Sequence, residues 1–274
     1  MTMLMLNGRI EPVEKAVVPA MDRGLTQGLG LYETLKLLDG VPVFFHEHVT
    51  RMNAGLATLR IDLPEDAPEL ARQIVQLAEV AGVPNGACRV LVTAGPPDGR
   101  PTLLIQVEVR EFPAHPLRLI SYHALRSTAD MKSKSFTTSH LAMQAARAAG
   151  ADDALFVDEQ GRAHEATTAN LFVRTAGRLL TPPLDGSILP GVVRTKVMEV
   201  CAAAGDPATE HPIVADELGA EDQVLLTSSV RGLVTAQSLD GRALNVDEQE
   251  LQRLRSLLDA AEQASAERFR RTCL

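Results

Sequence analysis

The chain has 274 residues, of which 45% are hydrophobic and 23% are charged. This length suffices for one large domain or two modest ones with a sizeable buried core. The formal net charge is −8 and the sequence pI is about 5.4, and no basic stripe with interleaved aromatic residues is present. These features argue against a nucleic-acid-binding protein.

Cysteine usage and hydropathy predict an intracellular protein without a membrane anchor. The three cysteines, Cys88, Cys201 and Cys273, form no Cys-x-x-Cys pair, which disfavours a zinc site or a disulfide framework. Such usage is typical of a reducing compartment. The apolar run near the start breaks at Asn7-Gly8, too early for a signal segment. No stretch approaches the roughly 18 apolar residues of a membrane span, so we expect a cytoplasmic location.

The N-terminal part is predicted to form a small α+β domain. An Asn-Gly turn predicts a hairpin between strands at Met3–Leu6 and Ile10–Val18. The loop Asp22–Gly30, with three glycines, precedes a strand at Leu31–Leu38.

On that strand, strict alternation puts Tyr32, Thr34 and Lys36 on one face. A polar face of this kind is either solvated or lines a pocket. Apolar residues at helical spacing then predict amphipathic helices over Phe45–Leu59 and Ala67–Ala81.

The first of these helices carries two side chains with possible chemistry. A metal site from His46 and His48 lacks a second ligand cluster, so it is disfavoured. The guanidinium of Arg51 is a planar fork that suits a phosphate, although a surface role is the simpler alternative.

Two further strands follow, and then a linker. Strands at Arg89–Thr93 and Thr102–Val109 flank a Gly/Pro-rich loop that carries Arg100. The segment Phe112–Pro116 contains two prolines and is the predicted linker. It separates an N-terminal domain, residues 1–115, from a C-terminal domain, residues 116–274.

The C-terminal part is predicted to alternate strands and helices. The expected strands are Leu117–Tyr122, Ala154–Val157, Asn170–Arg174 and Val224–Leu226, and the expected helices are Ser135–Ala149, one from Ile188–Arg194 to about Ala204, and Asp247–Phe269.

The stretch Asp130–Val173 carries the clearest chemistry. Lys132 lies between an extended segment and a helix with hydroxyl N-caps, and Glu165 and Asn170 follow among small polar residues. This arrangement can bring an amine and a buried carboxylate to one pocket. A surface lysine and a solvated turn carboxylate are the alternatives when each residue is taken alone.

Two later segments suit an anion. Gly191 opens a helix, whose first backbone N–H groups and positive dipole end favour negative charge. Thr227-Ser228-Ser229 ends a strand with hydroxyls and amides that can also cradle a phosphate. An ordinary capped turn is the alternative for each.

Six segments follow one another along the chain: DRGLTQGLGLYETL, HVTRM, MKSKSF, HEATTANLFV, TPPLDGSILPGVVR and LLTSSVRG. Together they resemble the class IV aminotransferases, fold-type IV enzymes that depend on pyridoxal 5′-phosphate (PLP). This family includes branched-chain and D-amino-acid aminotransferases and 4-amino-4-deoxychorismate lyase. The resemblance that these segments carry extends over roughly residues 4–245. The resemblance implies an α+β fold with a small N-terminal α/β domain and a larger C-terminal domain, a mixed β-barrel with helices. It also implies a homodimer, because relatives build each site partly from the neighbouring subunit.

The resemblance implies a role for each matched residue. Lys132 matches the lysine that forms the internal aldimine with PLP. Lys134 is the competing lysine, but Ala142 stands at the family's usual step from Lys132. Glu165 matches the carboxylate that contacts the pyridine nitrogen and keeps it protonated. Arg51 matches the arginine on the cofactor phosphate.

Further matches surround the cofactor. Val192 and Val193 match residues whose backbone N–H groups bind the phosphate, and Ser228 and Ser229 match the second phosphate turn. Leu189 matches the leucine packed on the ring. The Schiff base turns PLP into an electron sink, and the released lysine amine can then move the proton.

Two residues depart from the family pattern. Phe136 stands where many relatives have a tyrosine that reaches the phenolate oxygen of the cofactor. Ser135 stands where the lyases often have asparagine. Contacts to the phenolate oxygen are therefore the least defined part of the implied site.

The loop motifs and Thr34, at a threonine position seen in the lyases, favour 4-amino-4-deoxychorismate lyase, which releases pyruvate and 4-aminobenzoate. Tyr32, Thr34 and Arg100 are the predicted substrate contacts. One alternative is a branched-chain or D-amino-acid aminotransferase with 2-oxoglutarate as acceptor. A more remote alternative is a non-catalytic assembly protein that keeps the fold.

Overall fold

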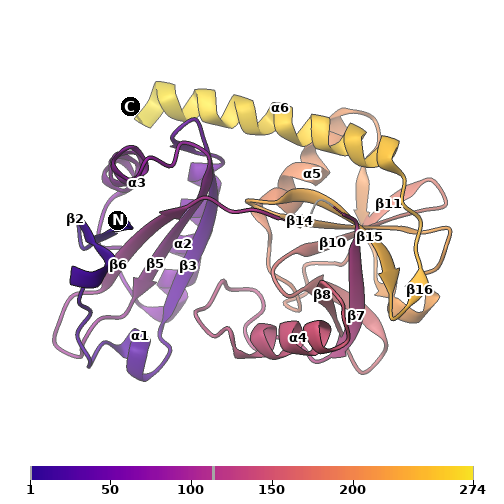
Figure 1. Cartoon of the computed structure of the whole chain (residues 1–274), viewed down its shortest axis with the longest axis horizontal. Coiled ribbons are helices and arrows are strands. Elements are labelled where there is room, and N and C mark those ends of the chain that lie inside the picture. Colours follow the sequence, from indigo (N-terminus) through magenta and orange to yellow (C-terminus); the bar gives the residue numbers. More distant parts are fainter. Residues whose placement is uncertain (1, 113–114, 274) are drawn as a thin grey trace. The chain divides into compact units, whose positions relative to one another are not determined.

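The computed structural model describes residues 2–112 and 115–273, and these form two compact units (Figure 1). Unit 1 comprises Met1–Glu111, Met131–Ser135 and Glu262–Leu274, and unit 2 comprises Phe112–Asp130 and Phe136–Ala261. Residues 113 and 114 of the predicted linker lie outside the described residues. A single boundary at residue 115 would assign Met131–Ser135 and Glu262–Leu274 to the C-terminal domain. In the structure, both segments belong to unit 1.

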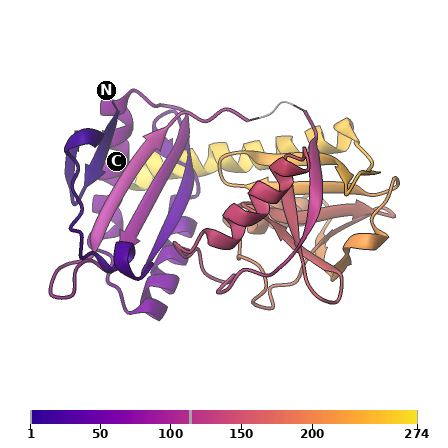
Figure 2. The same cartoon turned by 60° about the horizontal axis from the view of Figure 1, so that its bottom comes forward.

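Unit 1 is built on a six-stranded sheet in the order β2-β1-β6-β5-β3-β4, with every pairing antiparallel. Figure 2 shows its long strands side by side. The strands are β1 (Met3–Leu6), β2 (Arg9–Pro12), β3 (Gly30–Leu38), β4 (Val41–Pro42), β5 (Gly86–Thr93) and β6 (Thr102–Glu108).

One face of this sheet forms the core of unit 1. Leu35 on β3, Val90 on β5 and Ile105 on β6 are buried there. The helices α2 (Phe45–Leu59) and α3 (Ala67–Ala81) contribute their apolar stripes to the same core, as predicted.

The opposite face of β3 carries Tyr32, Thr34 and Lys36, all half-buried, so the predicted alternation is confirmed. The second strand of the first hairpin was predicted to reach Val18, which is wrong. It ends at Pro12, since proline has no N–H for the ladder, and a short 3-10 helix, η1 (Val13–Lys15), follows. The glycine-containing loop includes one helical turn, α1 (Arg23–Thr26), capped by Asp22.

Unit 2 is a closed barrel of six strands, β7, β8, β9, β10, β14 and β15, with both parallel and antiparallel pairs. Their bounds are β7 (Leu117–His123), β8 (Asp153–Val157), β9 (Arg162–Ala166), β10 (Asn170–Thr175), β14 (Gln223–Ser228) and β15 (Gly232–Leu239). Short strands extend it: β11 (Arg178–Thr181), β12 (Ala208–Glu210), β13 (Ile213–Val214) and β16 (Arg242–Ala243); a 3-10 turn, η2 (Ala215–Glu217), follows β13. Together with unit 1, this arrangement confirms the predicted α+β class.

Two helices of unit 2 match the predicted spans closely. Helix α5 (Val192–Ala203) begins directly after Gly191. Helix α4 (Thr137–Ala148) begins later than predicted, and its N-cap is Phe136, without a side-chain hydrogen bond. The expected hydroxyl cap is therefore wrong. Ser135 still belongs to the extended segment that packs with unit 1 and cannot also cap the helix.

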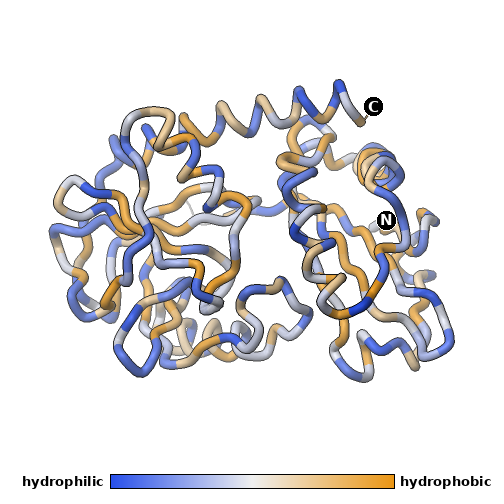
Figure 3. Tube along the Cα trace, turned by 180° about the vertical axis from the view of Figure 1, so that it is seen from behind, coloured by the Kyte–Doolittle hydropathy of each residue, from blue (hydrophilic) through white to orange (hydrophobic). Residues whose placement is uncertain are grey.

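The last helix, α6 (Glu248–Cys273), contributes residues to both units. Leu251, Leu254 and Leu258 are buried, as the predicted stripe required. Near its end, the ring of Phe269 contacts that of Phe45 edge-on, with 5.3 Å between centroids. Polar and apolar residues alternate along α6 (Figure 3). No helix among the described residues has the length and hydropathy that a membrane crossing requires.

Candidate active site

The lysine predicted to bind the cofactor lies on a five-residue extended segment of unit 1, Met131–Ser135. This segment runs antiparallel to β3, with Leu31 and Ser133 as bridge partners. The Tyr32 N–H donates to the Lys132 carbonyl over 3.1 Å, and the Lys134 N–H donates to the Gly30 carbonyl over 3.0 Å. Backbone pairing with the sheet therefore determines where Lys132 lies.

The amine of Lys132 lies over an aromatic ring. Its Nζ is 4.8 Å from the centroid of the Tyr32 ring, a distance typical of a cation–π contact. The structure thus brings together two residues that the sequence analysis singled out, Tyr32 as a substrate contact and Lys132 as the reactive lysine.

An arginine that sequence reasoning missed lies beside them. Arg89 on β5 is the cross-strand partner of Thr34, and its Cζ is 5.2 Å from the centroid of the Tyr32 ring. Its Nε is buried and has no hydrogen-bond partner. A buried guanidinium donor without an acceptor is costly, so this position favours an incoming anion. The predicted strand that begins at Arg89 indicates that alternate side chains point to opposite faces. Only the pairing of β3 with β5 shows that Arg89 lies on the same face as Thr34 and Tyr32.

Arg51 is held on α2 by a buried carboxylate. Its Nε donates to Glu33 Oε1 over 2.8 Å and its Nη2 to Glu33 Oε2 over 2.6 Å. His48 Nδ1 lies 2.7 Å from the same Oε2. Burial alone raises the pKa of Glu33, but Arg51 and His48 outweigh it and hold this pKa at about 2. Burial lowers the pKa of His48, and Glu33 accepts a hydrogen bond from its ring.

In unit 2, Glu165 lies on β9 and is 4% exposed. Its Oε1 accepts from Arg126, whose Nε is 2.9 Å away. Its Oε2 accepts from the Leu189 N–H over 3.1 Å and lies 3.4 Å from the Asn170 amide nitrogen. The carboxyl group is therefore buried and fixed in direction, and an arginine lies against it, which suits a contact with a protonated ring nitrogen.

The start of α5 packs closely on the strand after Glu165. A Cβ built on Gly191 would lie 1.8 Å from the Asn170 Oδ1, so only glycine fits there. The Asn170 amide donates to the Leu189 carbonyl over 2.9 Å. Gly191 is the N-cap and offers no side-chain acceptor, so the N–H groups of Val192 and Val193 remain uncapped by a side chain. This helix start is suited to a phosphate.

The turn that the sequence predicts as a second phosphate contact lies at the end of β14. Ser228 is the last residue of β14, and Ser229 follows it in the turn. The neighbouring Thr227 pairs with Asn170 across the ladder, and its hydroxyl is buried without a hydrogen-bond partner. Unit 2 thus brings a buried carboxylate, uncapped helix N–H groups and hydroxyls to strands β9, β10 and β14. This set fits the ring nitrogen and the phosphate of PLP.

Other predicted residues have different surroundings. Arg100 is exposed in the loop before β6. The amine of Lys134 donates to the Gly24 carbonyl over 2.5 Å. Phe136 is 42% exposed. Leu189 is buried, and its backbone serves Glu165 and Asn170 as described.

Similar proteins have names from several branches of one family. The chain is 26% identical over 254 residues to a D-alanine aminotransferase from Bacillus licheniformis, covering 88% of this chain and 89% of that protein. It is 26% identical over 251 residues to the aminodeoxychorismate lyase of Bacillus subtilis, covering 85% of each.

The fold is that of solved members of the same family. The structure of a branched-chain aminotransferase from Thermoproteus uzoniensis matches with a TM-score of 0.87 at 22% identity, covering 98% of this chain and 97% of that one. This confirms the predicted fold-type IV architecture. The family model for amino-transferase class IV matches residues 30–239. The chain therefore belongs to the class IV aminotransferase family of PLP-dependent enzymes.

Proposed function

We propose that this protein is a 4-amino-4-deoxychorismate lyase, which releases pyruvate and 4-aminobenzoate. The observation that carries the proposal is the arrangement on the face of β3 and β5. Lys132 and Arg89 contact the same Tyr32 ring, and Thr34 stands opposite Arg89. An amine, a hydroxyl and a guanidinium thus share one face of a sheet.

Each of these groups suits a different part of the substrate. Aminodeoxychorismate carries two carboxylates, and the Arg89 guanidinium offers a buried donor to one of them. The Thr34 hydroxyl can pass a proton on the same face, as its match to the lyases implies. Removal of pyruvate needs a proton moved at the ring carbons, and Lys132 supplies an amine for that step.

The cofactor residues follow from the same proposal. Bound PLP would supply an electron sink for the carbanion formed on the substrate. We propose that Lys132 holds it covalently, Glu165 contacts its ring nitrogen, and Leu189 packs on the ring. Arg51, the N–H groups of Val192 and Val193, and Ser228 and Ser229 would hold its phosphate.

An aminotransferase is the second candidate, and Arg89 is also the observation that favours it. The buried guanidinium would equally hold the side-chain carboxylate of glutamate or 2-oxoglutarate. The D-alanine and branched-chain aminotransferases among the similar proteins share the fold and the family. The alternative reaction is transfer of an amino group from a branched-chain or D-amino acid to 2-oxoglutarate.

Two incubations distinguish the candidates. The purified protein with PLP receives aminodeoxychorismate in one, and an amino acid with 2-oxoglutarate in the other. We expect pyruvate and 4-aminobenzoate from the first and no glutamate from the second. Glutamate without 4-aminobenzoate would overturn the lyase assignment, and a protein that shows no visible absorbance with PLP would support the assembly-protein alternative.

Two variants test the sheet face. Arg89→Met should raise KM by about tenfold or more, because a charged hydrogen bond to a carboxylate is lost, while kcat changes less. Thr34→Val keeps the shape of the side chain and should lower kcat more than it raises KM. Arg100→Met serves as the comparison for Arg89→Met, and an equal rise of KM in both would contradict the role of Arg89.

We also propose a homodimer, as the family implies. Light scattering on the eluting holoenzyme measures its mass directly. A monomeric mass together with full activity would contradict the proposal.

A further inference from the structure

The segment Met131–Ser135 carries two lysines, Lys132 and Lys134, and their amines have different surroundings. Because Lys134 and Lys132 are two residues apart on an extended segment, both side chains lie on the same face of the sheet. Lys132 stands beside Tyr32, whereas Lys134 stands beside Gly30, which has no side chain to block its path.

The amine of Lys134 reaches a rigid turn of unit 1. Its Nζ donates to the carbonyl of Gly24 in α1 over 2.5 Å. Gly24 itself is clamped, because a Cβ there would lie 2.4 Å from the Thr93 methyl carbon. Arg23, the preceding residue, donates to the Ala94 carbonyl over 2.6 Å and to the Gly95 carbonyl over 3.2 Å. The acceptor of Lys134 is thus fixed to the end of β5.

A buried carboxylate supplies the counter-charge. Asp22 is fully buried and accepts from the hydroxyls of Thr93 and Thr102 over 2.8 and 2.6 Å, and from the Gly24 N–H over 2.6 Å. Burial alone would raise the pKa of Asp22. The hydrogen bonds and the charge of Lys134 outweigh burial and lower it, so the group stays anionic.

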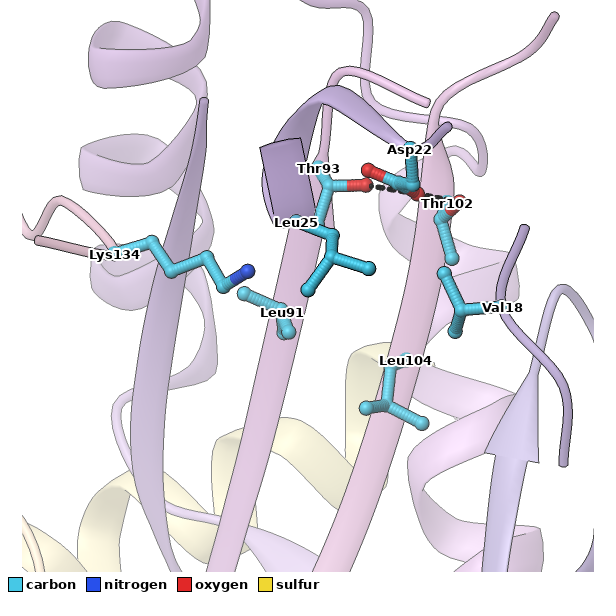
Figure 4. A pocket seen from close by; sticks show the side chains of 8 residues that line it. All are labelled: Val18, Asp22, Leu25, Leu91, Thr93, Thr102, Leu104 and Lys134. Carbon is cyan, nitrogen blue, oxygen red and sulfur yellow. Dashed lines mark hydrogen bonds between the residues drawn. The ribbon is translucent and has the colours of Figure 1, made fainter. Parts of the chain in front are cut away.

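Lys134 and Asp22 line one cavity (Figure 4). The volume of this cavity is about 200 Å³. Its other walls are mostly apolar, among them Leu25, Leu91 and Leu104. The amine end of Lys134 lies near Leu25 and Leu91 in Figure 4, and it donates to the Gly24 carbonyl. The cavity also leaves room for methionine or arginine at this position, so such variants need not overpack the core.

Only the five residues Met131–Ser135 of this part of the chain belong to unit 1, because the segments before and after them belong to unit 2. Two backbone hydrogen bonds, the packing of Met131 on the core of unit 1 and the Lys134–Gly24 hydrogen bond help to hold this short segment. We infer that Lys134 is a positioning residue: it anchors the segment on the Asp22–Gly24 turn so that the Lys132 amine stays over Tyr32. This inference rests on the proposed role of Lys132.

The test measures how firmly the holoenzyme retains PLP. In Lys134→Met, cofactor release after dilution into a PLP trap should be faster by about tenfold or more, as expected for loss of a charged hydrogen bond. The visible circular dichroism of the bound cofactor, which reports the geometry around it, should change as well. Lys134→Arg should restore both readouts, and Lys134→Gln, which keeps a donor without charge, should be intermediate.

Lys15→Met removes an exposed lysine by the same change of side chain and serves as the matched control. Wild-type release and dichroism in Lys134→Met would overturn the inference, even if the apoprotein unfolds at a lower temperature. If Lys134→Met does not fold, equal release rates in the Gln and Arg variants would overturn it.

A failure of the proposed function would be recognised by different results. If wild-type protein shows no visible absorbance with PLP, or if Lys132→Ala keeps that absorbance unchanged, the role of Lys132 is wrong. Neither result depends on Lys134.

Discussion

Two buried glutamates, one in each unit, are held by arginines in different ways. Glu33 in unit 1 binds Arg51 through both oxygens and also accepts from His48. Glu165 in unit 2 binds Arg126 through Oε1, and its Oε2 accepts from the uncharged Leu189 N–H. Both are almost fully buried, at 2% and 4% exposure.

Burial and an arginine partner therefore do not distinguish the carboxylate that we propose for the cofactor from one that supports an arginine. The charge of Glu33 is neutralised at both oxygens, so its task is to fix the direction of Arg51. Arg126 contacts one oxygen of Glu165, and the other oxygen lies against the Leu189 N–H and the Asn170 amide. These contacts fix the direction of the carboxyl group within unit 2.

We expect the largest loss of activity on substitution of Lys132, because neither Glu33 nor Glu165 offers an amine that could take its place. Lys132→Ala should lower kcat by roughly 10³-fold or more, since it removes the covalent anchor and the proton-transfer group together. Product formation by the refilled holoenzyme measures this. Activity within tenfold of wild type would show that another group performs the proton transfer.

Glu165→Gln tests the carboxylate of unit 2. It keeps the shape but removes the charge beside the ring nitrogen, so kcat should fall by about 10²-fold while the fold persists. Steady-state kinetics and far-UV circular dichroism give the two readings. Glu165→Asp retains the charge and should recover part of the loss; equal activity in the Gln and wild-type proteins would contradict the assignment.

Glu33→Gln should act on stability instead. The folded pKa of about 2 lies below the ordinary value of 4.5, so the stabilisation is complete above pH 4.5 and is lost as pH falls towards 2. The difference corresponds to about 3 kcal/mol of unfolding free energy. Urea unfolding should show that loss in the variant at pH 7, with a flatter pH dependence between 4.5 and 2. Glu79→Gln, on the exposed side of α3, is the control and should change neither.

The smallest effect is expected at Gly191. Gly191→Ala adds a methyl group that meets the Asn170 side chain, so the start of α5 must move from the strand that follows Glu165. PLP affinity should weaken by about tenfold, as for one misplaced charged hydrogen bond. Equilibrium titration of the apoprotein with PLP measures it. Ala204→Gly at the other end of α5 is the control, and a comparable loss there would point to helix stability instead.

Sequence patterns predicted the long elements of unit 1 well because their periodicity is undisturbed. Helices α2 and α3 and strand β3 carry regular apolar spacing and clear stops. Strand β9 was missed, although it carries Glu165. Its last four residues are all buried, which removes the alternation that marks a half-exposed strand.

The candidate site residues also fall into two groups: those found from sequence motifs and those found only from the structure. Lys132, Glu165 and Gly191 lie in motifs that can be found in the sequence alone. Arg89, Glu33 and Lys134 depend on sheet register and on contacts between residues far apart in the chain, such as Lys134 with Gly24. No local pattern encodes these contacts, because they form only when β3, β5 and the Met131–Ser135 segment are paired.

The most direct test of the central claim is a peptide map of the holoenzyme after reduction with borohydride, which makes the lysine–cofactor bond permanent. The account predicts the cofactor mass on Lys132 and none on Lys134, although both lie within one peptide segment. The Lys132→Met protein, treated in the same way, should carry no label. Label on Lys134, or on another lysine of the wild-type chain, would contradict the account.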